Sequence, residues 1–280
     1  MSRYPTLKLR EREIPNYEIF QWDIEDNLPQ IIGGKRSNVI VVGAWRGEEI
    51  ISFLKWPNPN IWAFEPNPHN FHYLKENYKK NKEVHCFNWA CGETNGVTNL
   101  YEANITGNDS LLEIRESERI KIKKIHKVEV RRLDSIESLA GRDFDLLWID
   151  AQGFELPILK GAGSLLNQTK ALFLELNEDD RTYKESTRAL DLETFLKEKG
   201  FYNAHQEKHD ETGSGLALFL RHEIKTTFFD QQNIDLRIKS LIENRRQFIF
   251  IPTNPFFRFL RKLLPEKIKN KIKRHLKKTH

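Results

Sequence analysis

Two carboxylates stand where the chain could do chemistry on a bound ligand. Glu65 follows the apolar run NIWAF, and Asp150 follows the apolar run DLLWI. Such runs are typical of strands buried in a parallel sheet, and these sheets bind ligands beyond the carboxyl ends of their strands. We therefore expect Glu65 to accept hydrogen bonds from ribose hydroxyls and Asp150 to act as a general base. Capping of the following helix is a second role for Asp150, compatible with the first.

A glycine-containing turn accompanies these acids. The apolar run NVIVV leads into the turn GAWRG, in which Gly43, Ala44, Trp45 and Gly47 are candidate cofactor contacts. Glu65 lies 22 residues after Gly43. A glycine turn after the first strand, with an acid about 20 residues further on, is typical of nucleoside-binding α/β proteins. The alternative is a turn that needs glycine only for its bend, with Glu65 as a solvated cap.

The residue types in the turn favour S-adenosylmethionine (SAM) over a dinucleotide. A dinucleotide fingerprint has glycine where Trp45 stands, because the backbone must approach the pyrophosphate closely. Glu48 and Glu49 follow the turn and would repel a phosphate group. SAM carries ribose, adenine and a sulfonium cation but no phosphate. A nicotinamide-dependent dehydrogenase is therefore disfavoured. The Trp45 side chain could instead line the pocket for the adenosine or for the acceptor.

The elements that must position these residues alternate between strands and helices. Strands are expected over 38–44, 60–64, 84–90, 127–133, 145–149, 170–176, 201–205 and 215–221. Helices are expected over 48–55, 66–80, 135–140, 156–166 and 191–199, and a hairpin over 92–104. This alternation predicts a doubly wound, mostly parallel α/β sheet. The chain then divides into a lead-in over 1–37, the α/β domain over 38–221, an extension over 222–255 and a basic helical tail over 256–280.

The motifs resemble those of one family. In chain order they are GAxxG from Gly43, FEPxP from Phe64, AxG from Ala90, RLD from Arg132, IDxQGxE from Ile149, LKGA from Leu159 and LELN from Leu174. Together they resemble the FkbM-type SAM-dependent methyltransferases. The resemblance implies a Rossmann-like class I methyltransferase fold, SAM as the cofactor, and O-methylation of a hydroxyl on a sugar, glycan or related metabolite.

The candidate site residues follow from the turn, the acids and this resemblance. The expected cofactor contacts are Gly43, Ala44, Trp45, Gly47, Glu65, Pro66, Ala90 and Asp150. The resemblance places Asp150 and Glu155 at the reaction centre as the catalytic pair. The chain departs from the family at Val41, where an acid usually helps to hold the amine part of SAM. Glu48, Glu49 or Asp150 could replace it; otherwise the protein is a non-catalytic, membrane-tethered SAM-fold binding protein.

Composition and charge indicate the compartment of the protein and the partners that it can bind. Lysine and arginine number 45 against 40 acids, a net charge of +5, but residues 256–280 alone carry +9 because they hold ten basic residues and one acid. The other 255 residues therefore sum to −4, which does not favour a nucleic-acid-binding surface. The opening residues lack the apolar core of a secretory signal, and two cysteines indicate a reducing compartment. We expect a cytoplasmic protein without a metal site.

The tail over 256–280 has the pattern of an interfacial helix. Phe256, Phe257, Leu260, Leu263 and Leu264 recur at near-helical spacing, and lysine and arginine fill the remaining positions. An apolar face opposite a cationic face favours the surface of an anionic membrane. We therefore expect peripheral attachment to the inner face of the membrane; a nucleic-acid contact and a solvated tail are the alternatives.

The tail can be tested directly. The full chain should co-sediment with anionic liposomes and leave them as salt is raised, since each Lys or Arg near an anionic leaflet contributes roughly 1 kcal/mol. It should bind neutral liposomes poorly. Truncation after Pro255 should leave the protein in the supernatant. If the truncated chain pellets equally well, the tail is not the anchor; if the full chain ignores liposomes but shifts RNA or DNA, the nucleic-acid alternative replaces the membrane.

Overall fold

The computed structural model describes residues 7–9, 12–34, 36–177, 181–208, 214–230, 232–235, 237–238 and 241. Contacts divide the chain into two units, Met1–Ile234 and Asp235–His280, and the fold and the candidate site lie in the first. The predicted membrane-binding tail over 256–280 lies outside the described residues. Among the described residues, no helix is both long enough and apolar enough to cross a bilayer.

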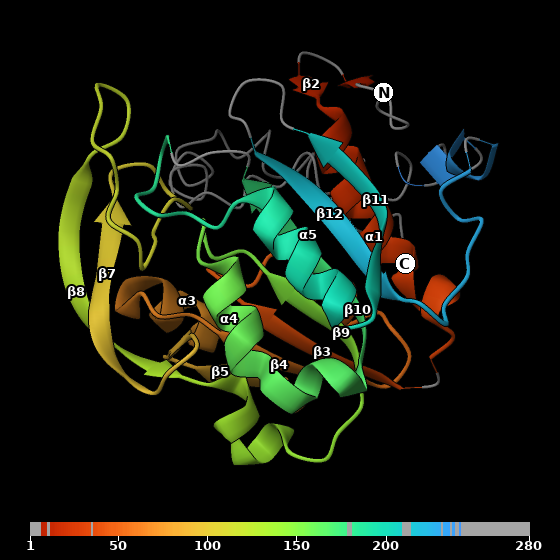
Figure 1. Ribbon diagram of the computed structural model, residues 1–280, viewed down its shortest axis with the longest axis horizontal. Helices are drawn as coiled ribbons and strands as arrows, with labels where there is room; N and C mark the ends of the chain where they lie inside the picture. Colours follow the sequence, from red (N-terminus) through yellow and green to blue (C-terminus); the bar gives the residue numbers. More distant parts are fainter. Residues whose placement is uncertain are drawn as a thin grey trace, which may run out of the picture. The chain divides into compact units, whose positions relative to one another are not determined.

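A seven-stranded sheet forms the centre of the first unit (Figure 1), in the order β11-β12-β10-β9-β3-β4-β5. Its strands are β3 (Ser37–Val42), β4 (Pro59–Phe64), β5 (Val84–Phe87), β9 (Phe144–Ile149), β10 (Thr169–Asn177), β11 (Phe201–Lys208) and β12 (Ser214–Arg221). The neighbours from β10 through to β5 are parallel, and β12 is antiparallel to both of its partners. The predicted doubly wound, mostly parallel α/β sheet is confirmed.

The strand order reverses beside β3. From β3 the chain first builds outward through β4 and β5, and it later builds in the other direction through β9 and β10. The carboxyl ends of β3 and β9 therefore lie side by side, with Val42 paired to Ile149. Open α/β sheets bind ligands at such a reversal, because the connections leave the sheet in opposite directions there.

Helices cover both faces of the sheet. They are α1 (Asn16–Ile32), α2 (Ile50–Phe53), α3 (Pro68–Tyr78), α4 (Glu155–Ala162) and α5 (Ala189–Glu198). In the view of Figure 1, α4 and α5 lie in front of the sheet and α1 lies behind it. Short 3-10 helices occupy Leu133–Ser135, Glu137–Leu139 and Gly163–Gln168, and a small hairpin, β1 (Leu7–Leu9) with β2 (Arg12–Ile14), precedes α1.

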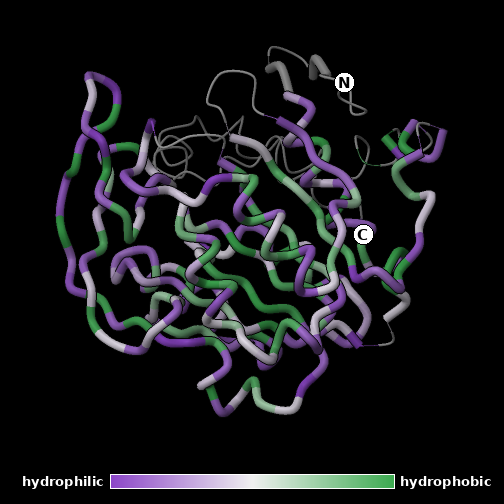
Figure 2. The backbone as a smooth tube through the Cα atoms, in the orientation of Figure 1, coloured by the Kyte–Doolittle hydropathy of each residue, from purple (hydrophilic) through white to green (hydrophobic). Residues whose placement is uncertain are grey.

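Alternate side chains of each central strand enter the two apolar layers. On the front face, Leu172 and Leu174 of β10 are buried with Leu192 and Leu196 of α5. On the back face, the Phe173 ring lies 4.2 Å from the Trp148 ring and 5.5 Å from the Phe20 ring of α1, centroid to centroid. Because both faces of these strands are buried, their sequences are continuous apolar runs. Figure 2 shows these runs in the hydrophobic colour along the backbone of the sheet.

Two regions differ from the sequence expectations. Residues 16–32, placed in the lead-in, form a helix whose Phe20, Ile24 and Leu28 are fully buried. The helix expected over 48–55 is reduced to α2, whose turns end near Trp56 and Pro57. Both differences arise from tertiary packing, because these segments gain their buried faces only against the sheet.

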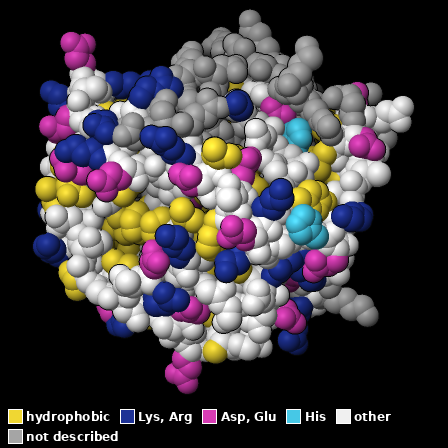
Figure 3. Space-filling model, viewed as in Figure 1, with side chains coloured by type: hydrophobic (Ala, Val, Ile, Leu, Met, Phe, Trp, Pro, Cys, Tyr) yellow, Lys and Arg dark blue, Asp and Glu magenta, His cyan; other side chains and the backbone are white. Residues whose placement is uncertain are grey.

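A second, three-stranded sheet replaces the hairpin expected over 92–104, because that segment forms one strand that pairs with residues 122–131. It consists of β6 (Ala90–Cys91), β7 (Gly96–Ala103) and β8 (Ile122–Arg131), in the order β6-β8-β7. The two cysteines lie in different sheets and are free. On the face drawn in Figure 3, hydrophobic side chains gather between the β7–β8 hairpin and α4. The second sheet therefore presents an apolar flank beside the carboxyl edge of the main sheet.

Candidate active site

The glycine turn after β3 touches the loop after β9. Gly43 and Gly47 both have φ near +80°, a conformation that L side chains rarely adopt. A Cβ atom on Gly43 would lie 1.8 Å from the backbone oxygen of Asp150. The amide nitrogens of Gly43 and Ala44 each donate to the Phe64 carbonyl oxygen at 3.0 Å. Three strand ends thus meet at this turn, and only glycine fits its first position.

Glu65 holds the turn from the end of β4. Its side chain is 5% exposed, and its two carboxylate oxygens accept hydrogen bonds from the backbone amides of Trp45 and Asn67, each at 2.8 Å. Burial raises the pKa of Glu65 to about 8, although these two hydrogen bonds oppose the rise. Each carboxylate oxygen has a second lone pair, so Glu65 can still accept from a ligand hydroxyl.

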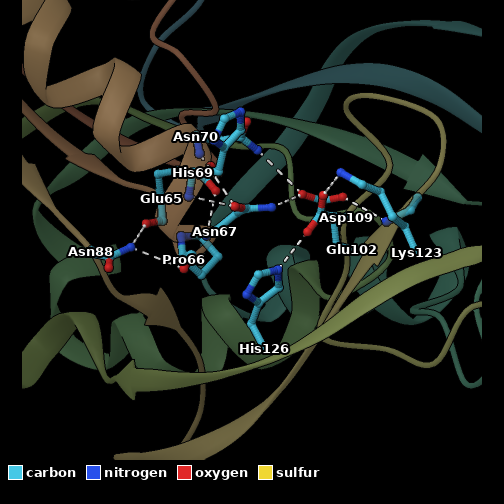
Figure 4. Close-up of polar contacts among 11 residues, drawn as sticks. Glu65, Pro66, Asn67, His69, Asn70, Asn88, Glu102, Asp109, Lys123 and His126 are labelled. Atoms are coloured by element: carbon cyan, nitrogen blue, oxygen red, sulfur yellow. Dashed lines mark hydrogen bonds and ion pairs between the residues drawn. The ribbon is translucent and has the colours of Figure 1, made fainter.

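A polar network fixes the segment that follows Glu65 (Figure 4). The Asn67 side chain caps α3 by accepting from the amide of His69, and it donates to Asp109 at 2.7 Å. The other oxygen of Asp109 accepts from the amide of Ala103 at 3.0 Å, so the network joins α3 to the end of β7. Asn88 donates to the carbonyl oxygen of Glu65 at 2.8 Å. These contacts make the hairpin part of the site.

The hairpin carries its own charged pair beside this network. Glu102 on β7 lies 2.7 Å from the imidazole of His126 on β8 and also pairs with Lys123 (Figure 4). These two partners lower the pKa of Glu102, although partial burial acts in the opposite direction. The basic run at Lys121–Lys124 thus contributes one lysine to an ion pair.

Asp150 lies at the end of β9 with an exposed side chain. It accepts a hydrogen bond from the amide of Gln152 at 2.8 Å, and the same nitrogen lies 3.2 Å from a Glu175 oxygen. Desolvation raises the pKa of Asp150, whereas its bond from Gln152 lowers it. Because Asp150 still reaches solvent, water moderates the rise. Burial, with the charges of Asp150 and Glu155, raises the pKa of Glu175 well above its ordinary value.

Gln152 is the centre of the contacts around Asp150. It has φ of +52°, which is uncommon for a residue other than glycine. Its side-chain oxygen accepts from the hydroxyl of Tyr183 at 2.7 Å, and its backbone oxygen accepts from the hydroxyl of Ser110 at 2.9 Å. Two segments that are distant in sequence therefore hold this loop. The sequence motif singled out Gln152 only as part of a pattern and gave no indication of Tyr183.

Glu155 faces its own loop. The side chain is 1% exposed, and one oxygen accepts from the amides of Gly153 at 3.1 Å and Ala151 at 3.3 Å. Its second oxygen is buried and has no hydrogen-bond partner. Burial raises the pKa of Glu155 to about 7. The structure thus places Glu155 below the loop that carries Asp150, where it orders that loop.

The remaining predicted contacts lie in different surroundings. Trp45 has φ of +43°, and its indole nitrogen is buried without an acceptor. The guanidinium of Arg46 lies 4.9 Å from the Trp45 ring and 4.6 Å from the Tyr73 ring. Pro66 is half-buried directly after Glu65. Ala90, in contrast, is buried in the packing of the three-stranded sheet, with Leu100, Val128 and Val130.

The described part of the chain contains no set of metal ligands. No group of three or more His, Cys, Asp or Glu side chains there could hold a metal ion. His205 lies on β11 and contacts Glu207 at 2.8 Å.

The fold and this geometry define a doubly wound α/β protein with a nucleoside-type site at the strand reversal. The methyltransferase FkbM domain matches residues 42–202, more than half of the chain, so the chain belongs to the FkbM methyltransferase family. This confirms the family that the motifs indicated. The chain is 27% identical over 157 residues to the 2-O-methyltransferase NoeI of Sinorhizobium fredii. That match covers 51% of this chain and 64% of the relative, less than two thirds of its length.

Solved structures show similarity at low sequence identity. A SAM-dependent methyltransferase from Clostridium acetobutylicum is 10% identical, with a TM-score of 0.44, over 74% of this chain and 92% of the other. An rRNA methylase from Streptococcus thermophilus is 8% identical, with a TM-score of 0.44, over 76% of this chain and 99% of the other.

The buried Glu155 makes stability depend on pH. Its pKa rises from 4.5 to about 7 in the folded chain, so the folded state holds more protons than the unfolded state between these values. The free energy of unfolding should therefore fall as pH rises through this window. Glu155→Gln removes this contribution. From about pH 5 to about pH 8, the wild type should lose up to about 3 kcal/mol relative to the variant.

Urea denaturation at several pH values measures this difference. The exposed Glu137→Gln serves as the matched control, and its stability should follow that of the wild type at every pH. If Glu155→Gln also follows the wild type in parallel, the carboxyl of Glu155 is ionised in the folded protein and the burial argument is wrong.

Proposed function

We propose that this protein transfers a methyl group from SAM to a hydroxyl of a sugar, glycan or related metabolite. The observation that carries the proposal is the meeting of the glycine turn, Glu65 and Asp150 at the strand reversal of a FkbM-family chain. Glu65 accounts for recognition of a ribose, and Asp150 accounts for removal of a hydroxyl proton. The 2-O-methyltransferase activity in the name of the Sinorhizobium relative supports the choice of oxygen as the acceptor.

The residues around the turn fit SAM. Gly43 and Gly47 give the turn its left-handed backbone, and the buried indole nitrogen of Trp45 is a donor without an acceptor. Glu65 is held with free lone pairs toward a diol. The Trp45 side chain and the acids at Glu48 and Glu49 oppose a pyrophosphate, so NAD fits poorly.

SAM supplies an electrophilic methyl group on a sulfonium. The chain's own part is to align the acceptor hydroxyl with that methyl and to take its proton. As the oxygen–methyl bond forms and the methyl–sulfur bond breaks, the hydroxyl proton passes to the Asp150 carboxylate. The hydrogen bond from Gln152 orients Asp150, and the raised pKa strengthens it as a base near neutral pH.

We also propose that the basic tail over 256–280 brings the enzyme to an anionic membrane surface. A lipid-linked glycan would then be a natural acceptor, because it is held at the same surface. The sequence pattern of the tail supports this proposal, and the liposome experiment given above tests it independently of the methyl transfer.

Donor binding tests the role of Glu65. In calorimetric titration, the wild type should bind S-adenosylhomocysteine (SAH) and ignore NAD. Glu65→Ala should weaken SAH binding at least about tenfold, because two hydrogen bonds to the ribose, each worth about 0.5–1.5 kcal/mol, are lost. Glu65→Gln keeps one acceptor oxygen, for the amide of either Trp45 or Asn67, and sets an NH2 donor against the other amide, so it should also weaken SAH binding. The exposed Glu76→Ala is the control, and an unchanged SAH affinity in Glu65→Ala would place the adenosine elsewhere.

Transfer from radiolabelled SAM to a panel of sugars, glycans and lipid-linked glycans tests the role of Asp150. Asp150→Asn keeps the size of the side chain and loses its basicity. Turnover on any acceptor that the wild type methylates should fall by about 10² or more if Asp150 is the base. The exposed Asp143→Asn should retain full turnover. Near-normal turnover in Asp150→Asn would move the base to another group, and SAH binding with no transfer to any acceptor would favour the non-catalytic binding protein.

A further inference from the structure

The end of β3 provides no acid for the donor pocket. Val41 is fully buried and pairs with Ala63 and Trp148 on the neighbouring strands, and Val42 is 4% exposed. Every side chain from Val39 to Val42 belongs to the apolar core. An amine on a ligand at this turn must therefore find its carboxylate on another element.

Glu49 has such a carboxylate, and one of its two oxygens lacks a hydrogen-bond partner. Its Oε1 atom is shielded from solvent and makes no hydrogen bond, although buried polar atoms are almost always hydrogen-bonded. Among the described residues, no lysine, arginine or histidine pairs with Glu49. The titratable groups that face it are Glu25 of α1, Tyr78 of α3, Glu48 beside it and Asp150 after β9. Burial first, and these neighbouring acids next, raise the pKa of Glu49 well above its usual range.

The position of Glu49 relative to the turn suggests the ligand group. Glu65 binds the amide of Trp45 inside the turn, and Glu49 follows Gly47, whose carbonyl oxygen accepts from the Tyr78 hydroxyl. The charge of Asp150 acts on both Glu49 and Glu65, so the two acids flank the same loop. A ligand that carries a diol at one end and a cation at the other would satisfy both acids.

We propose that Glu49 supplies the carboxylate that binds the α-ammonium group of SAM, in place of the acid that is absent from β3. Of the two cationic groups of SAM, the ammonium carries three N–H donors and the sulfonium carries none, so the ammonium is the cation that can donate to the unpartnered oxygen. Glu49 is thus a cofactor-binding residue of the proposed methyltransferase, and the inference rests on that proposed function.

Two ligands separate the ammonium from the rest of the donor. SAH carries adenosine, a thioether and the amino-acid part, whereas 5′-methylthioadenosine carries the first two and lacks the amino acid. Glu49→Gln should weaken SAH binding at least about tenfold and leave 5′-methylthioadenosine within about twofold, because one charge-assisted contact is lost. Glu48→Gln, the exposed acid beside it, should change neither affinity.

Proton release gives a readout that a merely structural role would not produce. Titration in two buffers of different ionisation enthalpy should show that SAH releases about half a proton or more from the wild type, because a bound cation favours the ionised form of Glu49. The release should be larger with SAH than with 5′-methylthioadenosine, which shares only the ribose contact, and Glu49→Gln should remove that difference. If Glu49→Gln does not fold, the test uses the wild type alone. The ratio of its affinities for SAH and 5′-methylthioadenosine should rise about threefold or more between about pH 6 and about pH 7.5.

The outcomes separate this inference from the proposed function. If both ligands bind but Glu49→Gln weakens them equally, or SAH and 5′-methylthioadenosine release the same number of protons, the ammonium site is wrong and the methyltransferase proposal stands. If Glu48→Gln selectively weakens SAH instead, the replacement acid is Glu48. If neither ligand binds the wild type, the proposed function fails, and the assignment of Glu49 fails with it.

Discussion

The close approach of Gly43 to the carbonyl oxygen of Asp150 is the constraint on which the rest of the site depends. A Cβ atom at Gly43 would lie 1.8 Å from that oxygen, so no side chain can separate the turn after β3 from the loop after β9. The pairing of Val42 with Ile149 brings the two loops together, and the strand order places nothing between them. The two roles proposed here, donor recognition by the turn and proton removal by Asp150, would thereby be held at one point.

This arrangement gathers acids that repel one another. Asp150 acts electrostatically on Glu49, Glu65, Glu155 and Glu175, and each of these four has a raised pKa whose first cause is burial. Burying carboxyl groups in this way is costly unless they hold protons or meet a cation. The site is therefore built at the expense of stability, which is typical where function sets the residue types. The raised pKa values mean that protons held by these groups relieve the repulsion, and a cationic ligand would be a second way to relieve it.

The parts that sequence reasoning could predict are those determined by local patterns. The apolar runs of β3, β4 and β9 predict the parallel sheet, and the residues that follow them place Glu65 and Asp150 at its carboxyl edge. The sequence indicates one short helix in the lead-in, and the full 17 residues of α1 escaped prediction because its apolar stripe is interrupted by acids that are themselves buried, Asp23 and Glu25. The direction of Glu155 toward its own loop also depends on a backbone geometry that a motif does not reveal.

The least predictable part of the site is the side on which an acceptor would enter. Ser110 and Tyr183 both hold Gln152, a short bridge pairs Ile114 with Tyr183, and Asp109 ties the same segment to Asn67. These contacts join segments up to 75 residues apart, as Asn108 and Tyr183 show, so no local pattern encodes them. The turn after β3 is fixed by backbone contacts within the sheet, whereas the Gln152 loop, which we propose faces the acceptor, is fixed by side chains from loops between the strands. Differences in those loops would change which acceptor is bound while leaving the donor site intact. The FkbM motifs lie mostly at the sheet edge and not in those loops. They therefore indicate the reaction more firmly than its substrate.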